Sequence, residues 1–548
     1  MNRPSSPPLT DRTPVDAAVR RAFGAALFAV FIGALDLTVI ATILPRMVVD
    51  LRINTADIDR YVWVVNGYLL AYVVAIPIVG RVSDLIGRRW AFQAALAIFA
   101  IGSVWCAFAD DLAGLIIGRA IQGAGGGALL PVTMALVGDL VPPARRTRAL
   151  GLVGAIDTLG WVLGPLLGAA IVAIAPGEEP WRWVFFINVP FAVAAGLALA
   201  RTSSGQRAIP KGWVSQLDLV GTLLLSGTLL LLNLGLSTGG EVGVAQTGGR
   251  ALGGTRNPLA PYLWSLLGGA LLLGVIFLWW ERRAATPLLP LHLFRQRGFT
   301  AAIAANAVVG VALIVAMVNV PVVVALLVAP ERVSAVSALM LAPFTLLMAV
   351  LSFGGGLIAG RLGELSTAAA GLVLVTAGYL ALWIGLQEGA YLGLLPGLFL
   401  AGAGFGLVIA PIGATVIDAA PETERGVAAA LTLVFRLLGM TIGISTLTAI
   451  GVRRLQALTG NLEAIVQGPN ETTAEFLARQ SQFLQERVIP LSIQVIRETF
   501  LIAGVVALLA LIPISRLRSR RGVAATGPAL PPAPREAHED HPQHYDRV

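Results

Sequence analysis

The feature that most constrains the fold is a series of apolar stretches, each long enough to cross a lipid bilayer, which recur from about residue 22 to residue 515. A transmembrane helix needs about 20 predominantly apolar residues. Transmembrane β-strands are shorter and alternate polar with apolar residues, whereas these stretches are continuous. The sequence therefore predicts an all-α membrane protein. Fourteen transmembrane helices are expected, at 22–46, 61–80, 90–109, 112–138, 149–175, 183–201, 217–236, 259–280, 299–327, 334–359, 366–387, 390–417, 426–452 and 490–515.

Composition supports this class and excludes several others. Charged residues make up 13% of the chain and hydrophobic residues 56%, whereas soluble domains carry about 25% charged residues. The net charge of +8 comes from arginines between apolar stretches, so no nucleic-acid partner is expected. Cys106 is the only cysteine, which excludes intramolecular disulfides and cysteine metal sites. Three tail histidines are interpreted as solvated, and no metal site is predicted: His538, His541 and His544.

The distribution of arginines predicts the orientation. Loops on the cytoplasmic side of a membrane carry an excess of Arg and Lys. If the N-terminus is cytoplasmic, that side receives most of the loop arginines, while one short outer connection offers only Asp110 and Asp111. Both termini are then cytoplasmic, which requires an even number of helices. We expect a multi-pass protein of the inner (cytoplasmic) membrane.

The helix pattern divides the chain into five parts. They are a disordered cytoplasmic N-terminus (1–21), a six-helix bundle (22–201), a two-helix insert with flanking cytoplasmic loops (202–298), a second six-helix bundle (299–515) and a disordered cytoplasmic tail (516–548).

One outer connection, residues 453–489, is too polar to cross the membrane but keeps apolar stripes at helical spacing. Thr472 and Glu475 form a capping-box pattern at the start of its second half. We predict two helices that prolong the last two spans out of the membrane as a hairpin. The alternative is a disordered loop.

The segment after the second predicted span reads GRVSDLIGRR, at 80–89. Its glycines permit a tight turn and close helix approach, its aspartate can lie at the N-terminus of a neighbouring helix, and its first arginine can pair with a carboxylate. A merely basic loop would not require this spacing. The predicted conformational switch loop comprises Gly80, Asp84, Gly87, Arg88 and Arg89.

The fourth and fifth spans carry two further motifs. GRAIQGAGGGALLP at 118–131 places Arg119 inside a helix, where it must face a partner or a cavity. GLVGAIDTLGWVLGPLLGAA at 151–170 contains small residues that permit close helix packing, and a proline that can bend the helix. Packing alone would explain these glycines equally well. The residues of this second motif are Gly160, Gly164, Pro165 and Gly168.

Together these motifs resemble those of the major facilitator superfamily, in its fourteen-helix drug:proton antiporter branch. The 80–89 segment is similar to the superfamily signature, and the fifth span is similar to the antiporter motif, with Ala169 where a second glycine is usual. GALDLTVIATILP (33–45) and WRWVFFINVP (181–190) also match this branch. In the C-terminal half, AGRLGELS (359–366) resembles the signature only weakly.

Within that branch the chain is similar to the mycobacterial exporters of triacylglyceride and drugs. It shares the GALD stretch ending at Asp36, a carboxylate at Asp157, the FRLLGM stretch around Arg436, and a helical extension before the last span. The resemblance implies two six-helix bundles with an inserted helix pair.

The resemblance implies a proton-coupled secondary active exporter of lipophilic or amphipathic compounds, of the multidrug efflux type. The alternative is an exporter of neutral lipids such as triacylglycerides, using the 453–489 hairpin. No G-x4-G-K-[ST] motif is present, so the proton gradient is the expected energy source and no cofactor is expected. A membrane-embedded lipid-modifying enzyme is disfavoured, because His292 is the only histidine outside the tail. We expect a monomer that binds lipophilic small molecules or lipids within the bilayer. The sequence leaves open whether an outer-side lipid-carrier lipoprotein acts with it.

Four ionisable residues lie deep in predicted spans, namely Asp36, Arg119, Asp157 and Arg436. Two acids and two bases form a neutral set that suits pairing in a low-dielectric interior, and a static salt bridge is one interpretation. The other is a pair between Asp36 and Arg436, which lie in opposite halves and could separate between access states. A buried carboxyl that loses its counter-ion favours its protonated form. The resemblance implies a proton role for Asp36 and Asp157.

Overall fold

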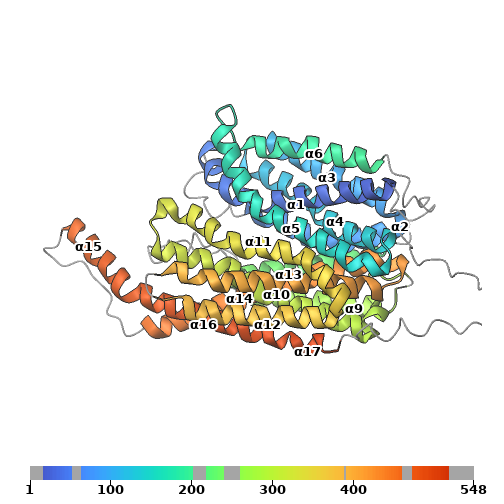
Figure 1. Cartoon of the computed structure of the whole chain (residues 1–548). Coiled ribbons are helices and arrows are strands. Elements are labelled where there is room, and N and C mark those ends of the chain that lie inside the picture. Colours follow the sequence, from blue (N-terminus) through green and yellow to red (C-terminus); the bar gives the residue numbers. More distant parts are fainter. Residues whose placement is uncertain are drawn as a thin grey trace, which may run out of the picture.

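The computed structural model describes residues 17–51, 63–200, 217–239, 260–284, 286–387, 390–459 and 472–516, and these residues form an all-helical protein (Figure 1). The predicted all-α fold class is confirmed. Helix α1 begins at Ala17, inside the segment expected to be disordered, and Ala22 and Ala25 of this helix are buried. Most of the two predicted tails lies outside the described residues.

Six helices of the N-terminal half pack against one another. The principal pairs are α2 with α4, α1 with α5, α3 with α4, and α3 with α6. Their bounds are α1 Ala17–Asp50, α2 Trp63–Ile86, α3 Arg88–Ala107, α4 Leu112–Leu140, α5 Pro143–Ile174 and α6 Arg182–Ala200. We call this group the first bundle.

The C-terminal half forms a second bundle, in which α12 packs on α13, α11 on α13, α10 on α14 and α12 on α16. Its long helices are α10 Arg297–Leu327, α11 Pro330–Leu362, α12 Glu364–Gly385, α13 Leu395–Ala419, α14 Arg425–Thr459 and α16 Ile489–Leu509. The short elements of this half are η4 Leu291–Arg295, η5 Tyr391–Leu394, η6 Glu422–Glu424, α15 Thr473–Phe483, the π-helix η7 Leu484–Val488, and α17 Leu511–Ile514.

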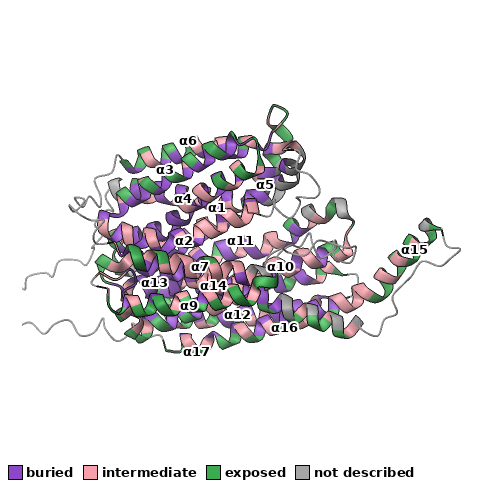
Figure 2. Cartoon of the chain, turned by 180° about the vertical axis from the view of Figure 1, so that it is seen from behind, coloured by how far each residue is buried: buried purple, intermediate pink, exposed green. Residues whose placement is uncertain are grey.

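Between the bundles in sequence lies a helix pair, α7 (Leu219–Gly239) and α9 (Leu263–Glu281), with the short turn η3 (Ala260–Tyr262) before α9. The two helices pack on each other, and α7 also packs on α2 and α14. Helix α9 is mostly exposed, with bare apolar side chains such as Trp264 and Leu271. Such a surface suits contact with lipid chains, as do the exposed outer sides of α3 and α6 (Figure 2).

Thirteen described helices are long and apolar enough to cross a membrane, and α5 supplies a fourteenth if it counts as one bent span. Helix α5 changes direction by 42° between Trp161 and Leu166, where the sequence places Pro165. A proline removes a backbone donor and crowds the preceding turn, which bends a helix at that point. The chain is therefore a multi-pass membrane protein.

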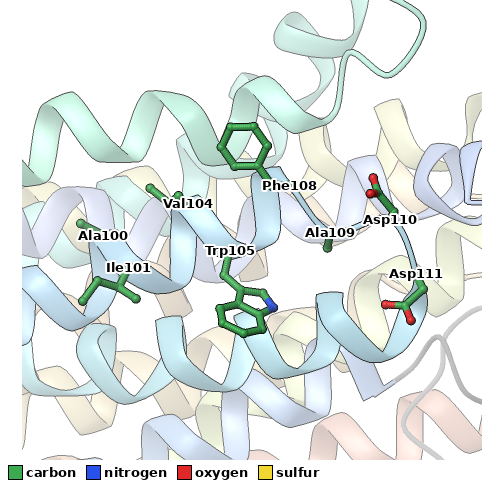
Figure 3. Close-up of a pocket in the computed structure, with 8 residues that line it drawn as sticks. All are labelled: Ala100, Ile101, Val104, Trp105, Phe108, Ala109, Asp110 and Asp111. Carbon is green, nitrogen blue, oxygen red and sulfur yellow. The ribbon is translucent and has the colours of Figure 1, made fainter.

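We call the end of the molecule where α1 begins and α17 ends the terminal face, and the end that carries α15 the opposite face (Figure 1). Near the opposite face, an open apolar hollow of about 690 Å³ lies on α3 (Figure 3). Phe108 points toward α6, where it meets Phe186 edge-on, and Trp105 packs over Gly118 of α4. Aromatic residues beside the carboxylates of Asp110 and Asp111 are typical of a membrane–water boundary.

Candidate functional site

A buried ion pair joins α1 to α4 in the middle of the first bundle. The Oδ2 atom of Asp36 lies 2.8 Å from Nη1 of Arg119, and each residue is 1% exposed. The guanidinium also lies 4.0 Å from the ring centroid of Tyr68, a cation–π contact. Either charge without the other would be costly at this depth, so the two groups neutralise each other.

Two amide side chains complete the environment of the Asp36 carboxylate. Gln122 Nε2 and Asn188 Nδ2 both donate to its Oδ1, over 2.9 Å and 2.6 Å. Gln122 also accepts from Arg119 Nη1 at 2.5 Å and donates to Ser103 Oγ at 2.8 Å. These neutral residues were not among the site residues expected from the sequence. The available signal was polar side chains in otherwise apolar spans, with Gln122 one helical turn from Arg119.

The predicted pairing of Asp36 with Arg436 is not the arrangement in this structure, where Asp36 pairs with Arg119 of its own bundle. Arg436 lies on α14 and interacts electrostatically across the bundles with Asp157 of α5, and both act on Tyr72 of α2. All three side chains are partly exposed although they lie mid-helix. Among the described residues, neither Asp157 nor Arg436 makes a direct ion pair. Asp157, rather than Asp36, is therefore the carboxylate within electrostatic range of Arg436.

The glycines of the fifth span place α5 directly against α1. A Cβ atom on Gly160 would lie 2.6 Å from Ala34 Cβ and 2.8 Å from the Phe31 oxygen, and one on Gly164 would lie 2.7 Å from the Leu35 oxygen. Gly168 is also buried. Because Gly160 is one turn from Asp157 and Ala34 is close to Asp36, this packing fixes the spacing of the two acids.

The predicted switch loop is mostly helical. Gly80 and Asp84 belong to the last turns of α2, and Gly87, with a φ of 91°, alone separates α2 from α3. A glycine can adopt that left-handed conformation without strain, so one residue suffices for the turn. Arg89 donates to the Ala200 oxygen at 2.6 Å and so ties α3 to α6.

Asp84 binds the N-terminus of α14 in the other bundle. Its two oxygens accept hydrogen bonds from the backbone nitrogens of Gly426 and Val427, at 2.9 Å and 3.0 Å. A carboxylate is stabilised there by unpaired amide groups and the helix dipole. Arg88 forms an ion pair with Asp84 and a second one with Asp139 at 3.0 Å. The segment therefore fastens the two bundles together at the terminal face.

A second set of contacts closes the same face between α5 and the α11–α13 region. Arg146 pairs with Asp418, and Glu364 accepts from the hydroxyls of Thr147 (3.1 Å) and Thr415 (3.0 Å). A Cβ atom on Gly356 would lie 2.7 Å from the Thr147 oxygen, so the helices touch along their backbones. Glu364 follows Gly363, whose φ is also 91°, in the 359–366 segment that weakly resembles the signature. The bundles are thus closed at the terminal face, where α5 and α11 converge (Figure 1).

The described residues include no group of three His, Cys, Asp or Glu side chains that could hold a metal ion. Comparison with known proteins agrees with the fold. The family model of the Major Facilitator Superfamily matches residues 26–444. The chain belongs to the major facilitator superfamily. It is a secondary transporter rather than an enzyme.

The curated relatives of this transporter include proteins named triacylglyceride transporters. The one from Mycolicibacterium smegmatis is 35% identical over 457 residues, covering 82% of this chain and 78% of the relative. Those from Mycolicibacterium hassiacum and Mycobacterium tuberculosis are 36% and 35% identical, covering 85% and 84% of this chain and 86% and 88% of the relatives.

Solved structures support the same fold. The proton:xylose symporter XylE of E. coli aligns with a TM-score of 0.60 at 14% identity, over 92% of this chain and 97% of that one. The human organic anion transporter MFSD10 aligns with a TM-score of 0.53 at 15% identity, over 90% and 99%. At these identities the likeness concerns the fold alone.

Replacing Asp84 with Asn should slow the transport cycle and leave substrate binding intact. The variant loses the charge at the α14 N-terminus and the ion pair with Arg88, which we expect to weaken closure by about 1 kcal/mol or slightly more, a shift of about five- to tenfold in population. Transport rate and equilibrium binding in proteoliposomes measure the two effects separately. Asp111→Asn is the matched control, because Asp111 caps α4 within one bundle. If Asp84→Asn transports at the wild-type rate, this segment has no role in the transport cycle and serves only to orient the chain in the membrane.

Gly80→Ala should prevent full closure of the terminal face. The added Cβ would lie 2.7 Å from Ala430 Cβ and 2.8 Å from the Gly426 oxygen, so α2 and α14 must separate. Spin labels on the exposed residues Trp90 and Leu362, in a Cys106→Ala background, should show a longer distance between the bundles. Gly360→Ala adds the same atom on α11 where nothing lies within 4 Å, and should leave the distance unchanged. Equal distances in both variants would contradict the assignment.

Proposed function

We propose that this transporter is a proton-coupled exporter of neutral lipids of the triacylglyceride type. The observation that carries the proposal is the helical extension beyond the bundle at the opposite face (Figure 1). The names of its relatives support the same substrate class. The neutral-lipid alternative of the sequence analysis thereby takes precedence over multidrug efflux.

The extension has two legs. The outgoing leg is the end of α14, and the returning leg is α15 with η7, which leads into α16. Helix α14 has 35 residues, about 52 Å at 1.5 Å per residue, whereas crossing the hydrocarbon core takes about 20 residues. On the returning leg, Thr472 and Glu475 form the predicted capping box, and α15 continues through η7 into α16. Arg454 and Glu498 pair across the legs at 3.0 Å. Residues 460–471, including part of the predicted hairpin, lie outside the described part of the chain.

The legs carry partly buried apolar side chains along one side: Leu455, Leu458, Phe476, Phe483, Leu484 and Val488. A neutral lipid that leaves the bilayer exposes its chains to water, at about 0.8 kcal/mol per CH₂ group. An apolar helical surface that stands out of the membrane reduces this cost. A small drug, which partitions into water far more easily, does not need such a surface.

Proton coupling in this proposal depends on the buried charges. In the structure Asp36 is neutralised by Arg119, while Asp157 and Arg436 interact electrostatically from different bundles. When the bundles separate at the terminal face, Arg436 moves relative to Asp157. A buried carboxylate that loses its counter-ion must be hydrated or bind a proton, because the isolated charge costs several kcal/mol.

The orientation follows from the same proposal. The extension would stand on the outer side of the cytoplasmic membrane and the terminal face would lie in the cytoplasm, as the arginine-rich segments of that face favour. The structure then corresponds to a state closed toward the cytoplasm. Both bundles belong to one chain, so a monomer can perform the cycle.

Efflux of amphipathic drugs is the second candidate. Asp157 and Tyr72 are both partly exposed between the bundles, and an acid beside an aromatic ring can attract a cationic amphiphile. This arrangement would bind a drug between the bundles, and such an exporter would not need the extension.

The decisive experiment uses the purified full-length protein. Lipids that co-purify with it are identified by mass spectrometry, and the protein is reconstituted with labelled triacylglyceride or an amphipathic dye under an imposed pH gradient. We expect enrichment of triacylglyceride over bulk lipid and its gradient-dependent release. Movement of the dye alone would favour drug efflux, and lipid release without a gradient would contradict proton coupling.

A further inference from the structure

The side chain of Asn188 lies beside Asp36 and is hydrogen-bonded to it. It lies on α6, is 7% exposed, and donates to Asp36 Oδ1 at 2.6 Å. That bond is its one hydrogen bond to a described residue. Among the described residues, the Asp36 carboxylate is thus the single hydrogen-bond partner of the Asn188 amide.

Gln122, the other amide at this carboxylate, is fixed in its orientation. Its Oε1 accepts from Arg119, and its Nε2 donates to both Asp36 and Ser103. Turning this amide over would place its oxygen against the carboxylate and its NH₂ group against the guanidinium. Asn188 meets no such restriction, because its own oxygen has no described partner.

The two protonation states of Asp36 need different partners. An ionised carboxylate only accepts hydrogen bonds, whereas a protonated one also has an O–H that must donate. In the structure Oδ2 faces Arg119 and Oδ1 faces two NH₂ groups, so all three neighbours are donors. The present arrangement therefore suits the ionised state and offers the acid no acceptor.

Other titratable groups around Asp36 do not replace that acceptor. Arg119 on α4, Tyr68 on α2 and Cys106 on α3 interact electrostatically with it, and α5, which packs on α1, carries Asp157. Of these, only Arg119 is hydrogen-bonded to Asp36, and it is a donor.

We propose that Asn188 is a positioning residue for proton binding at Asp36, and that its amide turns over when the carboxylate gains a proton. As a donor it stabilises the carboxylate, and once turned its oxygen accepts from the acid. The charged form gains more, because hydrogen bonds to ionised groups are stronger than neutral ones. Asn188 thus sets the pH at which Asp36 loads its proton. This inference rests on the proposed proton role of Asp36.

Infrared difference spectroscopy tests it on the reconstituted full-length protein. The carbonyl band of protonated Asp36 is assigned by its loss in Asp36→Asn and followed against pH. In Asn188→Leu we expect the midpoint to lie about one pH unit higher than in the wild type, and the band to shift to the frequency of an acid without a hydrogen-bond acceptor.

Asn319→Leu is the matched control, because Asn319 is also a helix amide with one side-chain partner, Thr499, but lies in the second bundle. It should leave the midpoint and the band unchanged, and comparable thermal unfolding of the two variants excludes a general loss of fold. An unchanged midpoint in Asn188→Leu would overturn the proposal, and a shifted midpoint with an unchanged band would overturn the turning of the amide. The titration reports on Asp36 whether or not the protein transports lipid. Failure of the lipid-export proposal can therefore be distinguished from failure of the proposal for Asn188.

Discussion

Asp36→Asn is expected to abolish proton-driven export while the protein remains folded and inserted. The asparagine oxygen can still accept from Arg119, so the contact between α1 and α4 is partly kept. The variant side chain cannot exchange a proton, and Arg119 retains an uncompensated charge at a site that is 1% exposed. We expect gradient-driven transport to fall at least about a hundredfold, to the level of protein-free liposomes, if each cycle requires this proton.

Transport of labelled triacylglyceride under an imposed pH gradient measures the effect. Asp110→Asn is the control, because that carboxylate lies in an exposed connection with a side chain 92% exposed, and should transport like the wild type. Full activity of Asp36→Asn would remove Asp36 from the coupling mechanism. Substrate counterflow without a gradient should persist in the variant, which separates coupling from loss of the substrate site.

Deleting residues 456–487 and joining the helices with a short Gly/Ser linker should cripple lipid export while efflux of small dyes largely survives. The deletion removes the end of α14, all of α15 and most of η7, and therefore the apolar surface outside the bundle. A triacylglyceride chain of many CH₂ groups, each costing about 0.8 kcal/mol in water, loses its shelter, and we expect a drop of at least about tenfold.

Point variants test whether lipid export needs the apolar side chains of the extension or only the presence of the extension. Combining Phe476→Ser, Phe483→Ser and Leu484→Ser should reproduce the lipid defect. The matched control changes three exposed positions of the same leg, through Ala478→Ser, Ser481→Ala and Gln485→Ser, and should not. Equal loss of lipid and dye transport in the deletion would indicate misfolding, and retention of both would return drug efflux to first place.

The helices themselves could be predicted because each one is encoded locally. A continuous apolar stretch fixes a span, and Thr472 with Glu475 fixes a helix start, without reference to distant residues. The sequence predicts a loop at 80–89, because helices normally need several residues to turn, whereas the structure continues α2 to Ile86 and begins α3 at Arg88. Gly87 accomplishes the turn alone, in a backbone conformation that sequence spacing does not reveal.

The partners of the buried charges could not be predicted in the same way. Arg119 and Arg436 were both candidate partners of Asp36, and the composition of a helix does not reveal which helix packs beside α1. Asn188 and Gln122 carry no charge, so nothing in the sequence marked them as more than polar residues in a span. The pair of Arg146 with Asp418 joins residues 272 positions apart, which only the packed bundles bring together.

Helix α14 has a mechanical consequence. A single helix of 35 residues begins where Asp84 binds, passes Arg436 about a third of the way along, and ends in the extension. Its backbone contact with Gly310 at Arg436 is tight enough to serve as a fulcrum. Arg436 lies about 11 residues from the start of α14 and about 23 from its end, so a tilt of about 10° about this contact moves the two ends by about 3 Å and 6 Å at 1.5 Å per residue. Release of Asp84 would thus move the extension in the direction opposite to the α14 N-terminus, so a single helix would couple the contacts of the terminal face, the charge site and the extension.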